Sequence, residues 1–307
     1  MSVLVLVLLG CGEPTAPAQP LPWEGVRLHL TIDDAVYQRS QQGAPLPDAA
    51  TVGALHADLL SHLEAREVSA SVFVNCGTLR EPAAELAPWV RAGHVVGNHT
   101  SGHLRLSDVG HEVWLEDVGA CHRVLSAALP EPPRWFRYPY LDRGETAEMT
   151  QAAATGLGEL GYRTAPVTVA TAEWVHAFAY REAAGDQAAQ RVIGDDYVRH
   201  MVDAVQAGRE MATALTDREV AHIVLLHLNE LNGAMLDDVL TAWAERGARF
   251  VDLHTAMADP IYAADNRYVG RGGISWLARV APDELLGERY WFGREEGRLL
   301  ERWPVSY

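Results

Sequence analysis

The sequence predicts an α/β fold, a distorted (β/α) barrel of about seven parallel strands. From residue 26 onward, short apolar runs rich in β-branched residues alternate with segments whose apolar residues recur at helical spacing. The composition is that of a globular protein, with 307 residues, of which 48% are hydrophobic and 21% charged. Because repeated strand–helix units form parallel sheets with helices outside, about seven of them indicate a closed or nearly closed barrel.

The expected elements follow one another in order. A strand over 27–32 precedes a helix whose apolar face carries Leu55, Leu59 and Leu63. Further strands are expected at 71–74, 94–96, 134–138, 162–169, 221–226 and 249–251. Further helices are expected at 82–92, 112–128, 145–160 and 234–245, and a long helix before residue 221 carries Val198, Met201, Val202 and Val205 on one side. No linker divides 23–260, and we expect the glycine-containing tail 261–307 to form loops and short segments packed on the same domain.

The first residues resemble a bacterial lipoprotein signal. An apolar run over 2–9, too short to span a bilayer, ends at Gly10-Cys11 before a proline-rich stretch over 13–22. This pattern predicts a signal and tether over 1–22 and export to the periplasm or cell envelope, with a lipid anchor at Cys11 as the one membrane contact. The departure is that no Lys or Arg precedes the apolar run, and the alternative is a buried first strand.

The charge and the residue types of the chain argue against several classes of partner and of chemistry. The 25 basic residues, all arginine, oppose 41 acidic ones, giving a net charge of −16 that disfavours nucleic acid as a partner. The absence of lysine excludes Schiff-base and P-loop chemistry. Two interpretations of Cys76 and Cys121 stay open: a disulfide in an oxidising compartment, or a free Cys121 on an apolar helix face beside Val118 and Leu125.

Polar residues follow the predicted strands at the ends where a βα barrel keeps its active site. Asp33 and Asp34 close the first strand, where two carboxylates can serve as metal ligand and general base; the alternative is a helix N-cap. His99 and His103, at i and i+4, can chelate one ion. With one Asp they form a two-imidazole, one-carboxylate set that leaves positions open for water. The glycosylation sequon at Asn98 conflicts with this ligation.

Two further strand-end groups complete the pattern. Arg137 lies among aromatic residues at the end of the fourth strand, and Asp33 is its expected partner because an unpaired buried charge is costly. His227 ends the apolar run 223–226. The alternatives are an ordinary arginine at a strand rim and a core histidine with satisfied hydrogen bonds.

Taken in order, the segments TIDDA, HTSGH, RYPY and LLH resemble the motifs of the polysaccharide deacetylases, carbohydrate esterase family 4 with NodB homology, over about residues 27–253. The resemblance implies a NodB-type distorted barrel and a catalytic domain over 23–260 that removes N- or O-acetyl groups from an acetylated glycan. It implies one divalent metal, zinc by ligand type, with cobalt, nickel or iron as alternatives. The glycan is not specified by the motifs.

The resemblance also implies roles for individual residues. Asp34, His99 and His103 would bind the metal, with Asp33 as general base and Arg137 holding that base. The backbone N–H of Tyr140 would face the oxyanion. His227 would be the general acid. Trp174 and Leu225 would line an apolar pocket for the acetyl methyl group.

The fourth motif departs from the family, because Ala170 stands where we expect the Asp that orients the catalytic histidine. Reduced activity, a substitute carboxylate such as Glu173 or Glu230, or a narrower substrate are all compatible with this departure. Two other functions therefore remain beside deacetylation: a catalytically weakened glycan-binding member, and a small-amide or imide hydrolase of the same superfamily.

Overall fold

The computed structural model describes residues 23–39, 45–286 and 291–305. The predicted signal, tether and Cys11 lie outside the described residues. Within the described part of the chain, no helix combines the length and apolar character needed to cross a membrane.

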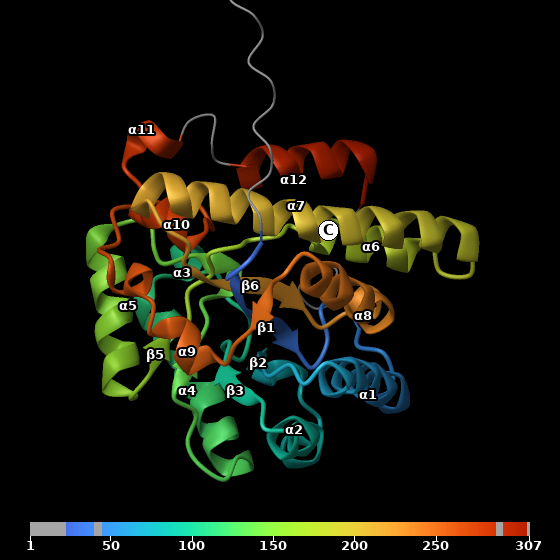
Figure 1. Cartoon of the computed structure of the whole chain (residues 1–307). Helices are drawn as coiled ribbons and strands as arrows, with labels where there is room; N and C mark the ends of the chain where they lie inside the picture. The colour runs from blue at the N-terminus through green and yellow to red at the C-terminus, as the bar shows by residue number, and fades with distance from the viewer. Residues whose placement is uncertain (1–22, 40–44, 287–290, 306–307) are drawn as a thin grey trace, which may run out of the picture.

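The described strands form one seven-stranded parallel sheet, as the sequence predicted (Figure 1). Its order is β5-β4-β3-β2-β1-β6, and β7 pairs with the beginning of β1. The strands are β1 (Arg27–Ala35), β2 (Ala70–Val74), β3 (Val95–Asn98), β4 (Trp135–Phe136), β5 (Arg163–Thr164), β6 (Ala221–His227) and β7 (Arg249–Phe250).

Helices surround this sheet, and α7, the longest of them, crosses one side of it (Figure 1). Those that follow β1 to β4 are α1 (Ala49–Ala65), η1 (Cys76–Thr78), α2 (Pro82–Arg91), α3 (Leu106–Val109), α4 (His111–Ala128), η2 (Pro139–Leu141) and α5 (Ala147–Glu159). Those that follow β5 to β7 are α6 (Trp174–Glu182), α7 (Gln187–Thr216), α8 (Glu230–Glu245), α9 (Leu253–Met257), η3 (Pro260–Ala263), α10 (Trp276–Val280), α11 (Asp283–Leu286) and α12 (Trp291–Arg302).

The strand expected over 134–138 is regular only in β4, and α3 and α6 were not expected. Two further differences concern the end of the sheet and the tail. The strand expected over 162–169 is regular only in β5, because Pro166 has no N–H to donate to a ladder. The chain beyond it still pairs with β6 at Val169 and Val224, so the sheet curls toward closure as a distorted barrel. The tail, expected as loops and short segments, includes the 12-residue helix α12, which packs on α6 and α7.

An aromatic cluster on α4 and β4 supports the strand end that carries Arg137. The Trp114 ring is fully buried, stacks on Tyr138 with ring centroids 5.2 Å apart, and meets Phe136 edge to face at 5.3 Å. Phe136 and Tyr138 flank Arg137 in sequence. Packing of α4 against β4 therefore helps to fix the backbone from which the arginine extends.

Replacing Trp114 with Ala removes this stack. We expect Trp114→Ala to lower the free energy of unfolding by about 3–5 kcal/mol, because it empties a large buried volume. Val113→Ala is the matched control, since its side chain on the same helix is 49% exposed. Chemical denaturation measures both, and equal losses in the two variants would contradict the packing described here.

Candidate active site

The carboxylates of β1 and the histidine of β6 lie side by side because of the strand register. Asp33 pairs in register with His227 in the parallel ladder, so both residues reach the same end of the sheet. Asp33 is buried, and Asp34 follows it with a φ of 54°, in the left-handed region that a non-glycine residue rarely adopts. The helix N-cap alternative is wrong for both, because the cap of α1 is Asp48.

Asp34, His99 and His103 come together as the sequence predicted. The Oδ1 atom of Asp34 lies 3.2 Å from Nε2 of His103 and 3.7 Å from Nε2 of His99. One ligand atom from each of the three residues lies within 4.8 Å of the others. Asp34 Oδ1 is buried and has no hydrogen-bond partner among the described residues. Two imidazole nitrogens and a carboxylate oxygen without a hydrogen-bond partner form a set of three atoms suited to binding a divalent metal.

The imidazoles of His99 and His103 are both in the neutral form that a metal ion binds. Burial lowers the pKa of His99 to about 3 and also lowers that of His103, so both are uncharged near neutral pH. His99 Nδ1 lies 2.9 Å from the carbonyl oxygen of Arg137, which fixes the tautomer that donates there and leaves Nε2 facing Asp34. Asn98 is fully buried with its amide bonded to Val118 and Tyr162, so the sequon is not a surface site.

Arg137 holds Asp33, as predicted. Its Nη1 donates to Asp33 Oδ2 at 3.3 Å, while Nη2 donates to Thr31 Oγ1 at 2.9 Å and Nε to the Ala165 carbonyl at 2.8 Å. Burial raises the pKa of Asp33 to about 6, and the guanidinium opposes that rise. A carboxylate that titrates near neutrality can accept a proton from water and give it up again.

His227 has a carboxylate partner, and it is Glu173 (Oε1–Nδ1 distance 3.3 Å). Glu173 is fully buried, and its Oε1 also accepts from the backbone N–H of His227 at 2.7 Å and from Asn232 Nδ2 at 2.9 Å. Burial alone would lower the pKa of His227, but the charge and hydrogen bonding of Glu173, together with the charges of Asp34 and Asp33, outweigh burial and raise this pKa to about 9. The imidazolium is therefore the stable form at neutral pH.

This arrangement answers the question raised by Ala170. Glu173 supplies the charge that we expected at position 170, so His227 does not lack an orienting carboxylate. Glu230, the other candidate, instead pairs with Arg181 at 2.9 Å and accepts from the hydroxyl of Tyr37. Ala170 lies in an apolar cluster with Val167 and Leu225, where no charge is required.

All but one of the predicted site residues line a single cavity of about 560 Å³, and Arg137 stands behind its wall. Tyr140, at the mouth, has a φ of 57° and is 41% exposed; its ring lies 4.5 Å from that of His103. Trp174 and Leu225 form part of an apolar side of the cavity. The sequence reading missed several further lining residues: Tyr37, Gln38, Arg39, Asn75, Arg105, Leu141, Phe178, Gly273, Phe292, Glu296 and Leu300. Those close in sequence to a motif, such as Arg105 and Leu141, could have been found by proximity along the chain. Those on α12 lie far from every motif and give no such signal.

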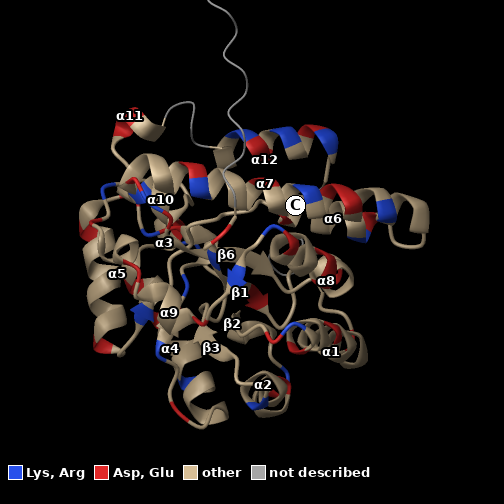
Figure 2. Ribbon diagram, in the orientation of Figure 1, with Lys and Arg blue, Asp and Glu red and all other residues tan. Residues whose placement is uncertain are grey.

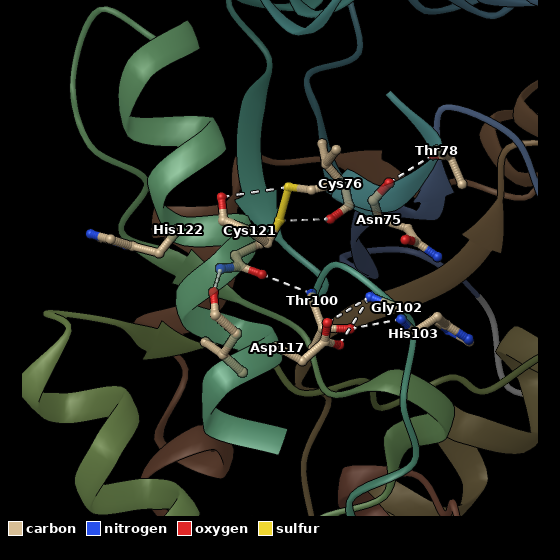
Figure 3. The surroundings of a disulfide bond; sticks show 12 residues. Asn75, Cys76, Thr78, Thr100, Gly102, His103, Asp117, Cys121 and His122 are labelled. Atoms are coloured by element: carbon tan, nitrogen blue, oxygen red, sulfur yellow. Dashed lines mark hydrogen bonds between the residues drawn. A yellow bond between two sulfur atoms is a disulfide. The ribbon is translucent and has the colours of Figure 1, made fainter. Parts of the chain in front are cut away.

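A disulfide braces the loop that carries the two histidines. It joins Cys76 in η1 to Cys121 in α4, with Cα atoms 5.2 Å apart, and so resolves the two interpretations of these cysteines (Figure 3). From the η1 side, the backbone N–H of Cys76 donates to the Thr100 carbonyl at 3.0 Å. From the α4 side, Asp117 accepts from the N–H of Gly102 at 2.8 Å. The disulfide therefore connects η1 and α4, and the loop that carries His99 and His103 is held between these two elements.

The close approach of η1 to this loop requires a glycine. The N–H of Gly77 donates to the Ser101 carbonyl at 2.9 Å, and a Cβ at position 77 would overlap that carbonyl oxygen. Thr100 and His103 both have positive φ values, 66° and 54°, and the Thr100 hydroxyl accepts from the His103 N–H at 3.0 Å. The histidines thus sit on a locally strained loop that its neighbours hold in place.

A family comparison covers the first part of the described chain. The model of the polysaccharide deacetylase family matches residues 26–164, which confirms the resemblance seen in the motifs. The matched segment contains the three metal-ligand candidates, Asp33, Arg137 and Tyr140, whereas Trp174, Leu225 and His227 lie beyond it. No curated protein matches this chain in sequence.

Solved structures of carbohydrate esterase family 4 share the fold of this chain. A CE4 family pseudoenzyme from Bacillus anthracis has a TM-score of 0.54 and 17% identity over 77% of this chain and 66% of its own. The chitin deacetylase of Colletotrichum lindemuthianum has a TM-score of 0.52 and 17% identity over 78% of this chain and 90% of its own. A family 4 carbohydrate esterase from Streptomyces lividans, in complex with acetate, has a TM-score of 0.50 and 17% identity, covering 76% and 96%. At this identity the likeness concerns the fold.

Removing the charge of Glu173 should release the pKa of His227. In Glu173→Gln we expect that pKa to fall from about 9 toward its ordinary value of 6.5, because the amide keeps the shape but not the charge. NMR titration of the metal-free protein measures it. Glu230→Gln is the control and should leave it unchanged. The raised pKa contributes stability that is complete below pH 6.5 and is lost as the pH rises through about 9.

Removing the disulfide should weaken both the fold and the candidate metal site. We expect the double substitution Cys76→Ala and Cys121→Ala to lower the free energy of unfolding by about 2–4 kcal/mol and to weaken any binding of a divalent metal such as zinc. Denaturation and zinc titration measure the two effects, with the reduced wild type as a control of unchanged side-chain volume. Wild-type zinc affinity in the double variant would show that the loop is positioned without the bridge.

Proposed function

We propose that this protein is a metal-dependent deacetylase that hydrolyses N- or O-acetyl groups of a polysaccharide. The observation that carries the proposal is the convergence of three sets on one cavity: Asp34 with His99 and His103, Asp33 with Arg137, and His227 with Glu173. Metal-dependent hydrolysis of an amide or ester uses a set of metal ligands, a general base whose pKa is near neutrality and a protonated general acid.

Asp34, His99 and His103 would hold one divalent ion, which we propose is zinc. The fit rests on two neutral imidazoles and a buried carboxylate oxygen that lacks a hydrogen-bond partner among the described residues. When bound, such an ion supplies Lewis acidity, lowering the pKa of a water and polarising the acetyl carbonyl. Cobalt, nickel and iron also accept this ligand set.

The remaining residues divide the proton transfers. Asp33, kept in place by Arg137, accepts the proton of the attacking water. His227, protonated through Glu173, gives its proton to the departing amine or alcohol so that acetate can leave. The Tyr140 backbone N–H would stabilise the negative charge on the acyl oxygen. Trp174 and Leu225 would surround the acetyl methyl group.

We also propose that the protein works outside the cytoplasm, in the periplasm or cell envelope, anchored by a lipid at Cys11. The Cys76–Cys121 disulfide supports this proposal, because such bonds persist in oxidising compartments. An acetylated glycan of the envelope or surroundings is the substrate that suits this location. Metabolic labelling with a palmitate analogue, compared between wild type and Cys11→Ala, tests the anchor.

Acetate release tests the function directly. The purified domain, stripped of metal and reloaded with zinc or cobalt, is incubated with a panel of acetylated glycans, and we expect metal-dependent release from at least one. One bound metal without release from any glycan would favour the weakened glycan-binding member. Turnover of small amides or imides instead would favour the small-substrate hydrolase.

Two substitutions separate the proposed roles. Asp33→Asn should reduce acetate release by roughly 10²–10⁴-fold while zinc content stays at one per chain, because the base is lost and the ligands remain. His99→Ala should lose both zinc and activity. His254→Ala, an exposed histidine on α9, is the control and should lose neither. Full activity in Asp33→Asn would contradict its role as base.

The pH profile should be bell-shaped. Asp33 must be ionised to accept a proton, so activity should rise as the pH passes about 6. His227 must be protonated to donate, so activity should fall as the pH passes about 9. Initial rates between pH 4 and pH 11 measure both limbs. A profile whose alkaline limb is the same in Glu173→Gln would argue against His227 as the acid.

A further inference from the structure

Helix α12, which lies beyond the family match, supplies one wall of the cavity that holds the candidate active site. Its residues Phe292, Glu296 and Leu300 line that cavity together with Trp174 and Leu225. The spacing of the three α12 residues, i, i+4 and i+8, puts them on one face of the helix. Figure 1 shows α12 lying along α7.

Phe292 joins the two apolar groups on which the proposed acyl pocket rests. It packs against the cluster of Val167, Ala170 and Leu225. It also packs against the cluster of Ala172, Val175 and Leu299, on which Trp174 packs as well. Phe292 therefore contacts both the apolar cluster that contains Leu225 and the apolar cluster on which Trp174 packs. From this position it bounds the part of the cavity next to these two residues.

Glu296 and Leu300 complete this wall. The Trp174 side chain interacts with the carboxylate of Glu296 and opposes the rise that burial causes in the pKa of Glu296, which links the indole to α12. Leu300 packs on the same cluster as Trp174 and Phe292. The Trp174 ring also contacts that of Phe178, with centroids 5.5 Å apart, so it is held from both α6 and α12.

The helix is fixed in this position by apolar and polar contacts. Leu299 is fully buried against α6 residues, and Glu295 pairs with His200 of α7 at 3.3 Å. Asp196 of α7 accepts from Trp303 Nε1 and pairs with Arg302 Nε, both at 3.0 Å. Charged residues of both signs line α7 and α12 in Figure 2. These contacts hold α12 in place as one wall of the cavity.

We propose that α12 closes the acyl pocket and that Phe292 sets the length of the acyl group the site accepts, favouring acetyl over longer chains. This inference rests on the proposed function and deepens it. Its physical basis is steric: a three-carbon or four-carbon acyl group entering beside Trp174 and Leu225 meets the Phe292 ring. A rigid apolar pocket discriminates against one extra methylene by roughly 10-fold or more.

Matched acyl series test the proposal. Chitooligosaccharides carrying N-acetyl, N-propionyl or N-butyryl groups are offered to the zinc-loaded wild type, Phe292→Ala and Arg294→Ala. Arg294 is exposed on the same helix and is the control. We expect the butyryl-to-acetyl ratio of kcat/KM to rise by roughly 10-fold or more in Phe292→Ala and to stay unchanged in Arg294→Ala. An unchanged ratio in folded Phe292→Ala overturns the proposal while leaving deacetylation intact.

A binding measurement keeps the two proposals separate. Acetate, propionate and butyrate are titrated calorimetrically into the same zinc-loaded proteins, so the result does not require turnover. We expect wild type to prefer acetate, and Phe292→Ala to lose that preference. Equal affinity for acetate and butyrate in wild type overturns the role of Phe292 even if deacetylation is confirmed. If Phe292→Ala does not fold, Phe292→Leu and Leu300→Ala take its place, with the same expectation and the same overturning result.

Discussion

The arginine at position 137 brings a full positive charge into the buried interior, where an unpaired charge would cost several kcal/mol. Its guanidinium is satisfied by Asp33, Thr31 and the Ala165 carbonyl, which belong to β1 and to the segment after β5. The same residue offers its backbone carbonyl to His99. The side chain of Arg137 thus contacts the proposed base and the segment after β5, and its backbone carbonyl contacts His99. The arrangement of the site therefore depends on the buried Arg137.

Much of the fold and the site could be predicted from the sequence, for a physical reason. Alternating strand and helix periodicities encode parallel βα units, and polar residues at the carboxyl ends of parallel strands meet at one edge. Asp33, Asp34, His99, His103, Arg137 and His227 all follow this rule and lie together. Strand register, which puts Asp33 opposite His227, is a direct consequence of pairing β1 with β6.

What could not be predicted depends on contacts between distant segments. The sequence leaves Glu173 and Glu230 as possible substitutes for the carboxylate absent at position 170. Only the fold shows that the Glu173 carboxylate reaches His227, while Glu230 pairs with Arg181. Helix α12 carries no motif, and its position is set by Leu299 and by ion pairs with α7. The early end of β5 follows from a proline, but the renewed pairing at Val169 is a tertiary effect.

The two halves of the site are held by different kinds of structure. Asp33 and His227 occupy neighbouring positions of a hydrogen-bonded ladder, which backbone geometry keeps nearly invariant. Asp34 and His103 instead have left-handed backbone conformations at turns, and His103 sits on a loop clamped by a disulfide. Sequence drift in such loops alters side-chain placement far more readily than drift in a buried ladder. Substitutions near that loop should therefore disturb the proposed metal-ligand set more readily than they disturb the juxtaposition of the proposed base and acid.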